Sequence, residues 1–179
     1  MSTRLVILGL LRERPLYGYE IKHIIEDRMG DWTNIAFGSI YYALDRLAEE
    51  DLIEEVATER EGGRPSRTVY RITEAGSEQF LVLLREVWSQ VERHYFTFDL
   101  GLTFMKALPI EEVKGWLRQR LGQLEAILHH LQAHQEEQMA CEEVPRLAAA
   151  VFEHSRAHFE AEFSWTQDLL GKVEQGLYP

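Results

Sequence analysis

The sequence predicts a mainly α-helical protein with two parts: an N-terminal domain of short helices and one β-hairpin, and a C-terminal domain of long helices. Three observations predict this fold. Apolar residues recur at spacings of three and four along most of the chain, as they do in amphipathic helices. Two short stretches on either side of a glycine- and proline-containing turn alternate apolar and polar residues, as paired strands do. Residues 110–173 carry long leucine and phenylalanine stripes.

Three short helices are expected in the first part of the chain. Leu5–Leu11 is apolar on nearly all sides and ends before Pro15, which cannot continue a helix. Tyr17–Met29 places its isoleucines on one face, its charges on the other and Gly30 at its end. A third helix is expected from Gly38 to Glu50. Its apolar positions are Ile40, Ala43, Leu44 and Leu47.

A β-hairpin is expected next. Leu52–Val56 and Thr68–Ile72 alternate like strands, and Glu61–Ser66 supplies the turn between them. Three helices followed by such a hairpin form a winged helix-turn-helix domain with a two-stranded wing. In that arrangement the third helix enters the major groove of DNA, while the wing follows phosphates or enters the minor groove.

The remainder of the chain is expected to be helical. A helix opening at Thr73–Gly76 is followed by helices at 110–138 and 146–173, and no internal repeat is visible. The two long C-terminal helices have little other surface in a small chain on which to bury their stripes. The sequence therefore predicts an intersubunit helical bundle, and with it a homodimer.

Composition limits the possible partners and surroundings. The formal net charge of −11 argues against a general affinity for nucleic acid, although residues 60–71 carry four arginines and one glutamate. The only cysteine, Cys141, excludes an intramolecular disulfide and fits a reducing cytoplasm. The apolar run Leu5–Leu11 is too short to span a membrane, so no membrane partner is expected.

Three motifs in the first 76 residues resemble those of the PadR family of transcriptional regulators. They are Leu16-Tyr-Gly-Tyr-Glu-Ile21, the segment Gly38–Ile53, and Gly63-Arg-Pro-Ser-Arg-Thr-Val-Tyr-Arg-Ile-Thr-Glu-Ala-Gly76. The long C-terminal part is similar in layout to that of the larger members, which have a helical dimerisation domain. In two positions the chain departs from the family pattern: Tyr42 replaces a frequent proline, and Asp51 replaces a frequent glycine.

The resemblance implies a homodimeric repressor that binds double-stranded DNA at an inverted-repeat operator and is released by a small-molecule effector. Residues 1–76 would be the DNA-binding domain, and residues 77–179 the domain for dimerisation and effector sensing. In the phenolic-acid branch of the family the effectors are hydroxycinnamic acids, and other members respond to drugs. Asp51 would then have to adopt left-handed backbone geometry, which aspartate tolerates.

Within this arrangement, DNA contacts are expected from the third helix, the wing and two flanking positions. Arginines at the wing tip suit phosphate or minor-groove contact, because their planar guanidinium is weakly hydrated. Tyr41 is equally well explained as a core residue, and Lys22 as an ordinary surface residue. The candidate DNA-binding residues are Ser39, Tyr41, Tyr42, Arg46, Arg64, Arg67, Lys22 and Asn34.

A small-molecule effector, expected to be aromatic, would bind near the last helix. The candidate pocket residues are His154, His158, Trp165 and Tyr17, although aromatic stripes more often form a dimer core. No cofactor, metal or catalytic residue is expected. The two histidine pairs, His130 with His134 and His154 with His158, lack further ligands at zinc-binding spacing, and the acids beside Cys141 disfavour a thiolate.

Two rival interpretations remain open. The acidic composition fits a winged-helix module that binds another protein rather than DNA, because a fold does not by itself determine function. The histidine pairs alone motivate a small helical enzyme or metal carrier.

Overall fold

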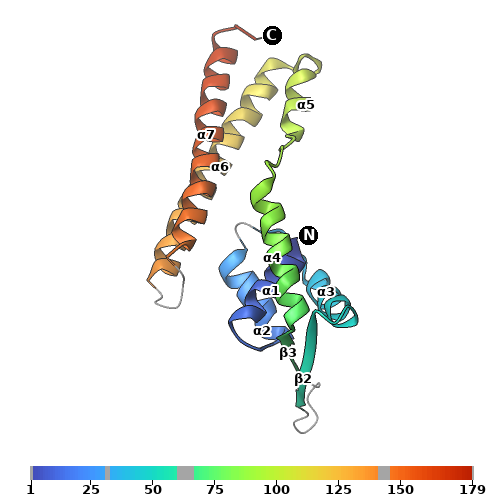
Figure 1. Cartoon of the computed structure of the whole chain (residues 1–179). Coiled ribbons are helices and arrows are strands. Elements are labelled where there is room, and N and C mark those ends of the chain that lie inside the picture. The colour runs from blue at the N-terminus through green and yellow to red at the C-terminus, as the bar shows by residue number, and fades with distance from the viewer. Residues whose placement is uncertain (1, 31–32, 60–66, 141–145, 179) are drawn as a thin grey trace. The chain divides into compact units, whose positions relative to one another are not determined.

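The computed structural model describes residues 2–30, 33–59, 67–140 and 146–178. The chain divides into two compact units, Met1–Glu92 and Arg93–Pro179, each with its own packed interior (Figure 1). Within the described ranges no helix is both long enough and apolar enough to cross a membrane.

The first unit combines helices with a small sheet. In chain order its described elements are α1 (Ser2–Glu13), β1 (Leu16–Tyr17), α2 (Gly18–Met29), α3 (Phe37–Glu49), β2 (Ile53–Glu59), β3 (Arg67–Ile72) and α4 (Glu74–Ser89). Helices α2 and α3 form the helix-turn-helix, and β2 and β3 form the wing. The winged-helix prediction is therefore confirmed.

The sheet has one strand more than the sequence predicted. Its order is β1-β3-β2, and all pairs are antiparallel. Leu16 lies opposite Tyr70, so β1 anchors the segment between α1 and α2 to the wing. A strand of two residues is too short to produce a recognisable alternation, which is why sequence analysis missed it. The ladder between β2 and β3 shifts register between Glu55 and Ala57, as at a β-bulge.

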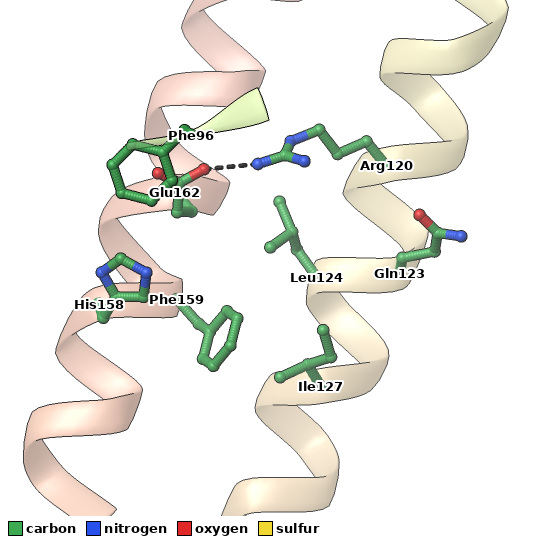
Figure 2. A pocket seen from close by; sticks show the side chains of 8 residues that line it. All are labelled: Phe96, Arg120, Gln123, Leu124, Ile127, His158, Phe159 and Glu162. Carbon is green, nitrogen blue, oxygen red and sulfur yellow. Dashed lines mark hydrogen bonds and ion pairs between the residues drawn. The ribbon is translucent and has the colours of Figure 1, made fainter. Parts of the chain in front are cut away.

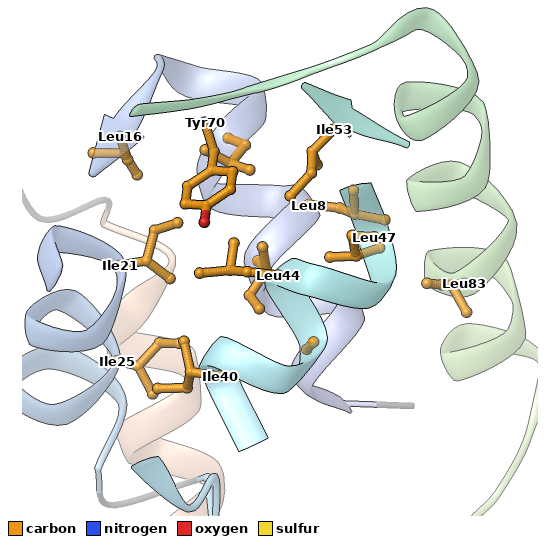
Figure 3. Packing of buried hydrophobic residues seen from close by; sticks show 13 residues of the cluster. Leu8, Leu16, Ile21, Ile25, Ile40, Leu44, Leu47, Ile53, Tyr70 and Leu83 are labelled. Carbon is orange, nitrogen blue, oxygen red and sulfur yellow. The ribbon is translucent and has the colours of Figure 1, made fainter. Parts of the chain in front are cut away.

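One apolar core holds the first unit together. It draws on all three N-terminal helices, the sheet and α4, as the close view in Figure 3 shows. Its labelled members are Leu8, Leu16, Ile21, Ile25, Ile40, Leu44, Leu47, Ile53, Tyr70 and Leu83. The apolar positions expected for the third helix all lie in this core. Their burial fixes which face of α3 remains in solvent, because a helix with one face buried must expose the other.

The first unit extends beyond Gly76, where the sequence placed the domain boundary. Helix α4 packs on α1: Leu83 is buried in the shared core, and the Phe80 ring lies under the guanidinium of Arg12, 4.9 Å from its carbon. Structurally, α4 therefore belongs to the first unit. The functional assignment of the two parts of the chain remains a prediction.

Asp51 makes the turn from α3 into the wing. Its φ of 57° lies in the left-handed region, which confirms the geometry expected where the family often has glycine. The turn is closed by backbone hydrogen bonds from Asp51 N–H to the Ala48 carbonyl (3.1 Å) and from Leu52 N–H to the Leu47 carbonyl (2.9 Å). The hydroxyl of Thr73 also donates to the Asp51 carbonyl at 2.8 Å. These bonds connect the end of α3 to the base of the wing.

All regular secondary structure in the described part of the second unit is helical. It contains α5 (Thr97–Thr103), a short 3-10 helix (Met105–Ala107), α6 (Ile110–Met139) and α7 (Ala148–Glu174). The two long helices lie within two residues of the ranges predicted for them. Sequence analysis missed α5 and the 3-10 helix, since neither is long enough to establish a helical period.

The stripes of α6 and α7 are buried largely against each other. The two helices form a hairpin within one chain (Figure 1). Leu117, Leu124 and Leu131 of α6 are buried, as are Phe152 and Val173 of α7. The expectation that these stripes find little surface within their own chain was therefore wrong for the buried residues, because each helix covers much of the stripe of the other. Burial by a second subunit remains a prediction for the stripe residues that are only partly buried, Leu121, Leu128 and Phe163.

Candidate functional site

Helix α3 presents a solvent-facing surface next to the wing. Tyr42 is 65% exposed, whereas Ile40 and Leu44, on the opposite face of the same helix, are fully buried. Arg46 lies one turn after Tyr42, and its guanidinium carbon is 5.9 Å from the centre of the Tyr42 ring. This surface carries hydrogen-bonding and aromatic groups at the spacing of one helix face.

Ser39 and Tyr41 are less free to contact a ligand. The Ser39 hydroxyl donates to the Ala36 carbonyl at 2.6 Å, so Ser39 lies in the first turn of α3 rather than at its cap. Tyr41 is only 38% exposed. A methyl group at Gly18 would lie 3.3 Å from the Tyr41 ring, so the tyrosine packs closely on the start of α2. Tyr41 is thus partly core and partly surface.

Arg46 is held by an acid on its own helix. It forms an ion pair with Glu49 at 2.5 Å, and this hydrogen bond raises the pKa of the Arg46 guanidinium. Exposed pairs of this kind contribute little to stability, because water screens the two charges. A phosphate oxygen can therefore replace the Glu49 carboxylate at small cost.

Sequence analysis did not weigh two acids on the same surface. Asp45 and Glu49 are exposed on α3, three and seven residues after Tyr42. Their spacing places them on the face of Tyr42, and this signal was available in the sequence. Near DNA these carboxylates repel phosphates, whereas they accept hydrogen bonds from the amino groups of bases. The exposed face of α3 therefore carries charges of both signs, and attraction to DNA phosphates alone would bind it weakly.

The remaining candidate DNA contacts lie outside α3. Lys22 is on α2, 3.5 Å from the Glu26 carboxylate, and Asn34 is exposed in the loop before α3. Arg64 lies outside the described residues. Arg67 is the first residue of β3, but its side chain is likewise not described. Contacts by all four residues remain predictions.

A pocket of about 250 Å³ lies along the α6–α7 hairpin (Figure 2). Helix α6 contributes a largely apolar wall with one guanidinium and one amide, and α7 contributes aromatic and acidic side chains. Phe96, from the segment before α5, stacks on the His158 ring with the centroids 6.0 Å apart. The lining residues are Phe96, Arg120, Gln123, Leu124, Ile127, His158, Phe159 and Glu162.

An ion pair crosses this pocket. A terminal nitrogen of Arg120 donates to the Glu162 carboxylate at 2.6 Å (Figure 2). The Nε of Arg120 donates to the hydroxyl of Thr166 at 3.3 Å. Thr166 is fully buried. Sequence analysis missed Arg120 and Glu162, yet a signal for Arg120 was available. It lies between Leu117 and Leu124 on the apolar stripe, where a charge requires a partner.

A second pocket of about 290 Å³ adjoins the first and shares Phe96 and Glu162 with it. Its other lining residues are Phe98, Asp99 and Trp165. The edge of one ring meets the face of the other between Phe98 and Trp165, whose centroids are 5.9 Å apart.

The structure brings together only part of the candidate effector set. His158 and Trp165 line these two neighbouring pockets, whereas His154 is exposed on α7 and lines neither. Tyr17 is in the first unit, where its ring stacks on Tyr19 at 5.4 Å. A role in effector binding remains a prediction for all four residues.

The other histidine pair has a packing role. The His134 ring is nearly perpendicular to the buried Phe152 ring, with the centroids 5.4 Å apart, and the centroid of the His130 ring lies 5.9 Å from that of His134. In the ranges that the structure covers, no three metal-ligating side chains come together.

The fold and the α3 surface define a winged-helix protein of the kind that regulates transcription, and comparison with known proteins supports this class. The model of the transcriptional regulator PadR-like family matches residues 7–81. The negative transcriptional regulator PadR of Bacillus subtilis is 25% identical to the chain over 94% of this chain and 96% of its own. Residues 7–81 of the chain match the PadR-like family, and the protein is a PadR-type transcriptional regulator.

Two solved structures extend the similarity to the whole fold. Bacillus subtilis PadR in complex with operator DNA has a TM-score of 0.82 and 23% identity, covering 97% of this chain and 99% of that one. The same protein in complex with p-coumaric acid has a TM-score of 0.80 and 22% identity, with the same coverage. At this identity, the likeness establishes the fold of both units.

Proposed function

We propose that the protein is a homodimeric repressor that binds an inverted-repeat operator through α3 and the wing and is released by a small molecule. The observation that carries this proposal is the α3 surface. A helix of the right size for the major groove has one face locked in the core and exposes Tyr42 and Arg46 on the other. As a DNA-binding regulator it would act in the cytoplasm and catalyse no reaction.

The proposed homodimer is supported by apolar side chains that one chain leaves in water. Trp88 is 83% exposed, Val91 99%, Tyr95 81% and Phe104 69%. Single exposed apolar residues are common, but each unit exposes large ones, Trp88 and Val91 in the first and Tyr95 and Phe104 in the second, and such exposure is typical of an interface. A second copy would cover them and supply the second α3 for the other half-site.

Two findings on one relative support the remaining parts of the proposal. The name of the Bacillus subtilis relative describes negative regulation, and a solved structure of PadR from that organism contains p-coumaric acid. In this chain the pockets of the second unit offer sites for a small ligand. Ligand binding that favours a DNA-incompetent state by about a hundredfold would shift the equilibrium by about 2.7 kcal/mol.

Selection of bound DNA from a random double-stranded pool tests the proposal. The dimer should enrich an inverted repeat whose half-sites are centred about one helical turn apart, since two α3 helices must enter successive major grooves. A matched selection with Tyr42→Ala and Arg46→Ala should lose this enrichment, whereas Arg118→Ala, a change in the second unit, should preserve it.

The acids on α3 favour a second candidate function, the binding of a basic protein surface. Failure of the unaltered protein to enrich any sequence at low salt, together with salt-sensitive binding to a basic partner, would contradict DNA recognition and support this rival.

A further inference from the structure

We propose that the pocket beside Trp165 binds a small organic cation of the quaternary ammonium type, and that this chain therefore selects against aromatic carboxylates. The role of that cation as the effector depends on the proposed function. Its binding to the pocket does not.

The pocket is built from aromatic rings and carboxylates. Three of its five lining residues are aromatic (Phe96, Phe98 and Trp165), and the other two are Asp99 and Glu162. The face of an aromatic ring carries partial negative charge and attracts cations, and cages of such rings recognise quaternary ammonium groups. None of the residues lining this pocket is basic.

The same cluster already holds one cation. The guanidinium carbon of Arg120 lies 4.3 Å from the centre of the Phe98 ring, and the guanidinium is paired with Glu162 at 2.6 Å. A ring face and a carboxylate thus stabilise a positive charge at the edge of this pocket. The Arg120 and Glu162 side chains are 28% and 23% exposed, so water only partly screens the interaction.

One negative charge in the pocket has no counterpart. Glu162 is balanced by Arg120, whereas the Asp99 carboxylate forms no ion pair within the described part of the chain. Phe96 and Trp165 are each 43% exposed, so both rings retain surface for a ligand. A cationic ligand would balance Asp99 and cover these rings. An anionic ligand would meet the unbalanced Asp99 carboxylate, which is unfavourable because like charges repel.

The size of the pocket limits the ligand. About 290 Å³ is at the lower end of the volumes of small-molecule sites and suits a compact ammonium group rather than a multi-ring molecule.

The test uses the full-length protein without DNA, and choline as the probe. Its neutral analogue, 3,3-dimethylbutan-1-ol, has the same shape without the charge, and p-coumarate supplies the anionic arm. Each is titrated while the indole N–H signal of Trp165 is followed by NMR, assigned with Trp165→Phe. We expect choline to shift this signal and to bind about tenfold or more tightly than the neutral alcohol, because the rings and Asp99 act on the charge.

Variants separate the pocket from the rest of the surface. Asp99→Asn should weaken choline binding about fivefold and reduce its salt dependence. The control is Asp168→Asn, which removes an exposed carboxylate of α7 outside both pockets and should leave the affinity unchanged.

Three outcomes would overturn the proposal: equal binding of choline and its neutral analogue, no effect of Asp99→Asn, or no shift of Trp165 at any choline concentration. Failure here is distinct from failure of the DNA-binding proposal, which the random-pool selection tests without ligand.

Discussion

Replacing both wing-tip arginines, Arg64→Ala and Arg67→Ala, is expected to weaken operator binding roughly 10–100-fold at physiological salt. Arg64 lies in the sequence between strands β2 and β3, and Arg67 is the first residue of β3. These are the positions at which a wing meets the DNA backbone. A charge-assisted hydrogen bond contributes about 1.5–3 kcal/mol. Only part of this free energy is lost in the variant, because water can hydrogen-bond to the phosphate in place of the arginine.

Salt dependence gives the sharper measurement. Each phosphate contact contributes about 0.9 to the slope of log K against log salt, so the double variant should have a slope smaller by roughly 1.8. The matched control is Arg118→Ala with Arg156→Ala, which removes the same charge from exposed ion pairs of the second unit. If both double variants lower affinity and slope equally, net charge alone is responsible and the wing makes no specific contact.

Replacing Gly76 by alanine should lower the free energy of unfolding of the first unit by about 2 kcal/mol. A methyl group at this position would lie 1.9 Å from the Leu52 carbonyl oxygen and 2.9 Å from a side-chain carbon of Ile72. That oxygen accepts a hydrogen bond from the Thr73 N–H, so it cannot move without disturbing the base of the wing. Overpacking costs up to about 3 kcal/mol, and the better helix propensity of alanine offsets about 1 kcal/mol.

Gly122→Ala in α6 is the control, because a methyl group there meets nothing within 4 Å. It should be neutral or stabilise the protein by up to about 1 kcal/mol. Urea unfolding followed by circular dichroism compares the midpoints of the three proteins. A Gly76→Ala midpoint at or above that of the unaltered chain would show that α4 does not pack against the wing base as the structure has it.

The sequence predicted the regular elements well, because each contains enough residues to establish a period. The stripe of α3 and the long stripes of α6 and α7 have the expected positions. The left-handed geometry of Asp51 was also predicted, because aspartate occupies a position where the family often has glycine. Strand β1 and helix α5 were not found, since their formation depends on tertiary partners: β1 exists because Leu16 pairs with Tyr70.

The site was predictable to a smaller extent. Exposure of Tyr42 and Arg46 follows from the burial of the opposite face of α3. The pairing of Arg120 with Glu162 joins residues 42 positions apart, on two different helices. No local sequence pattern shows how two such helices are aligned with each other. The error over the α6–α7 stripes has the same origin. A periodic pattern shows that a face is buried, but it does not identify the surface that covers it.

The central claim is that α3 enters the major groove, and methylation interference on the selected operator tests it most directly. Methyl groups at guanine N7 project into the major groove, whereas those at adenine N3 project into the minor groove. We expect methylated guanines in both half-sites to block binding. Retention of full affinity with every half-site guanine methylated would contradict the account.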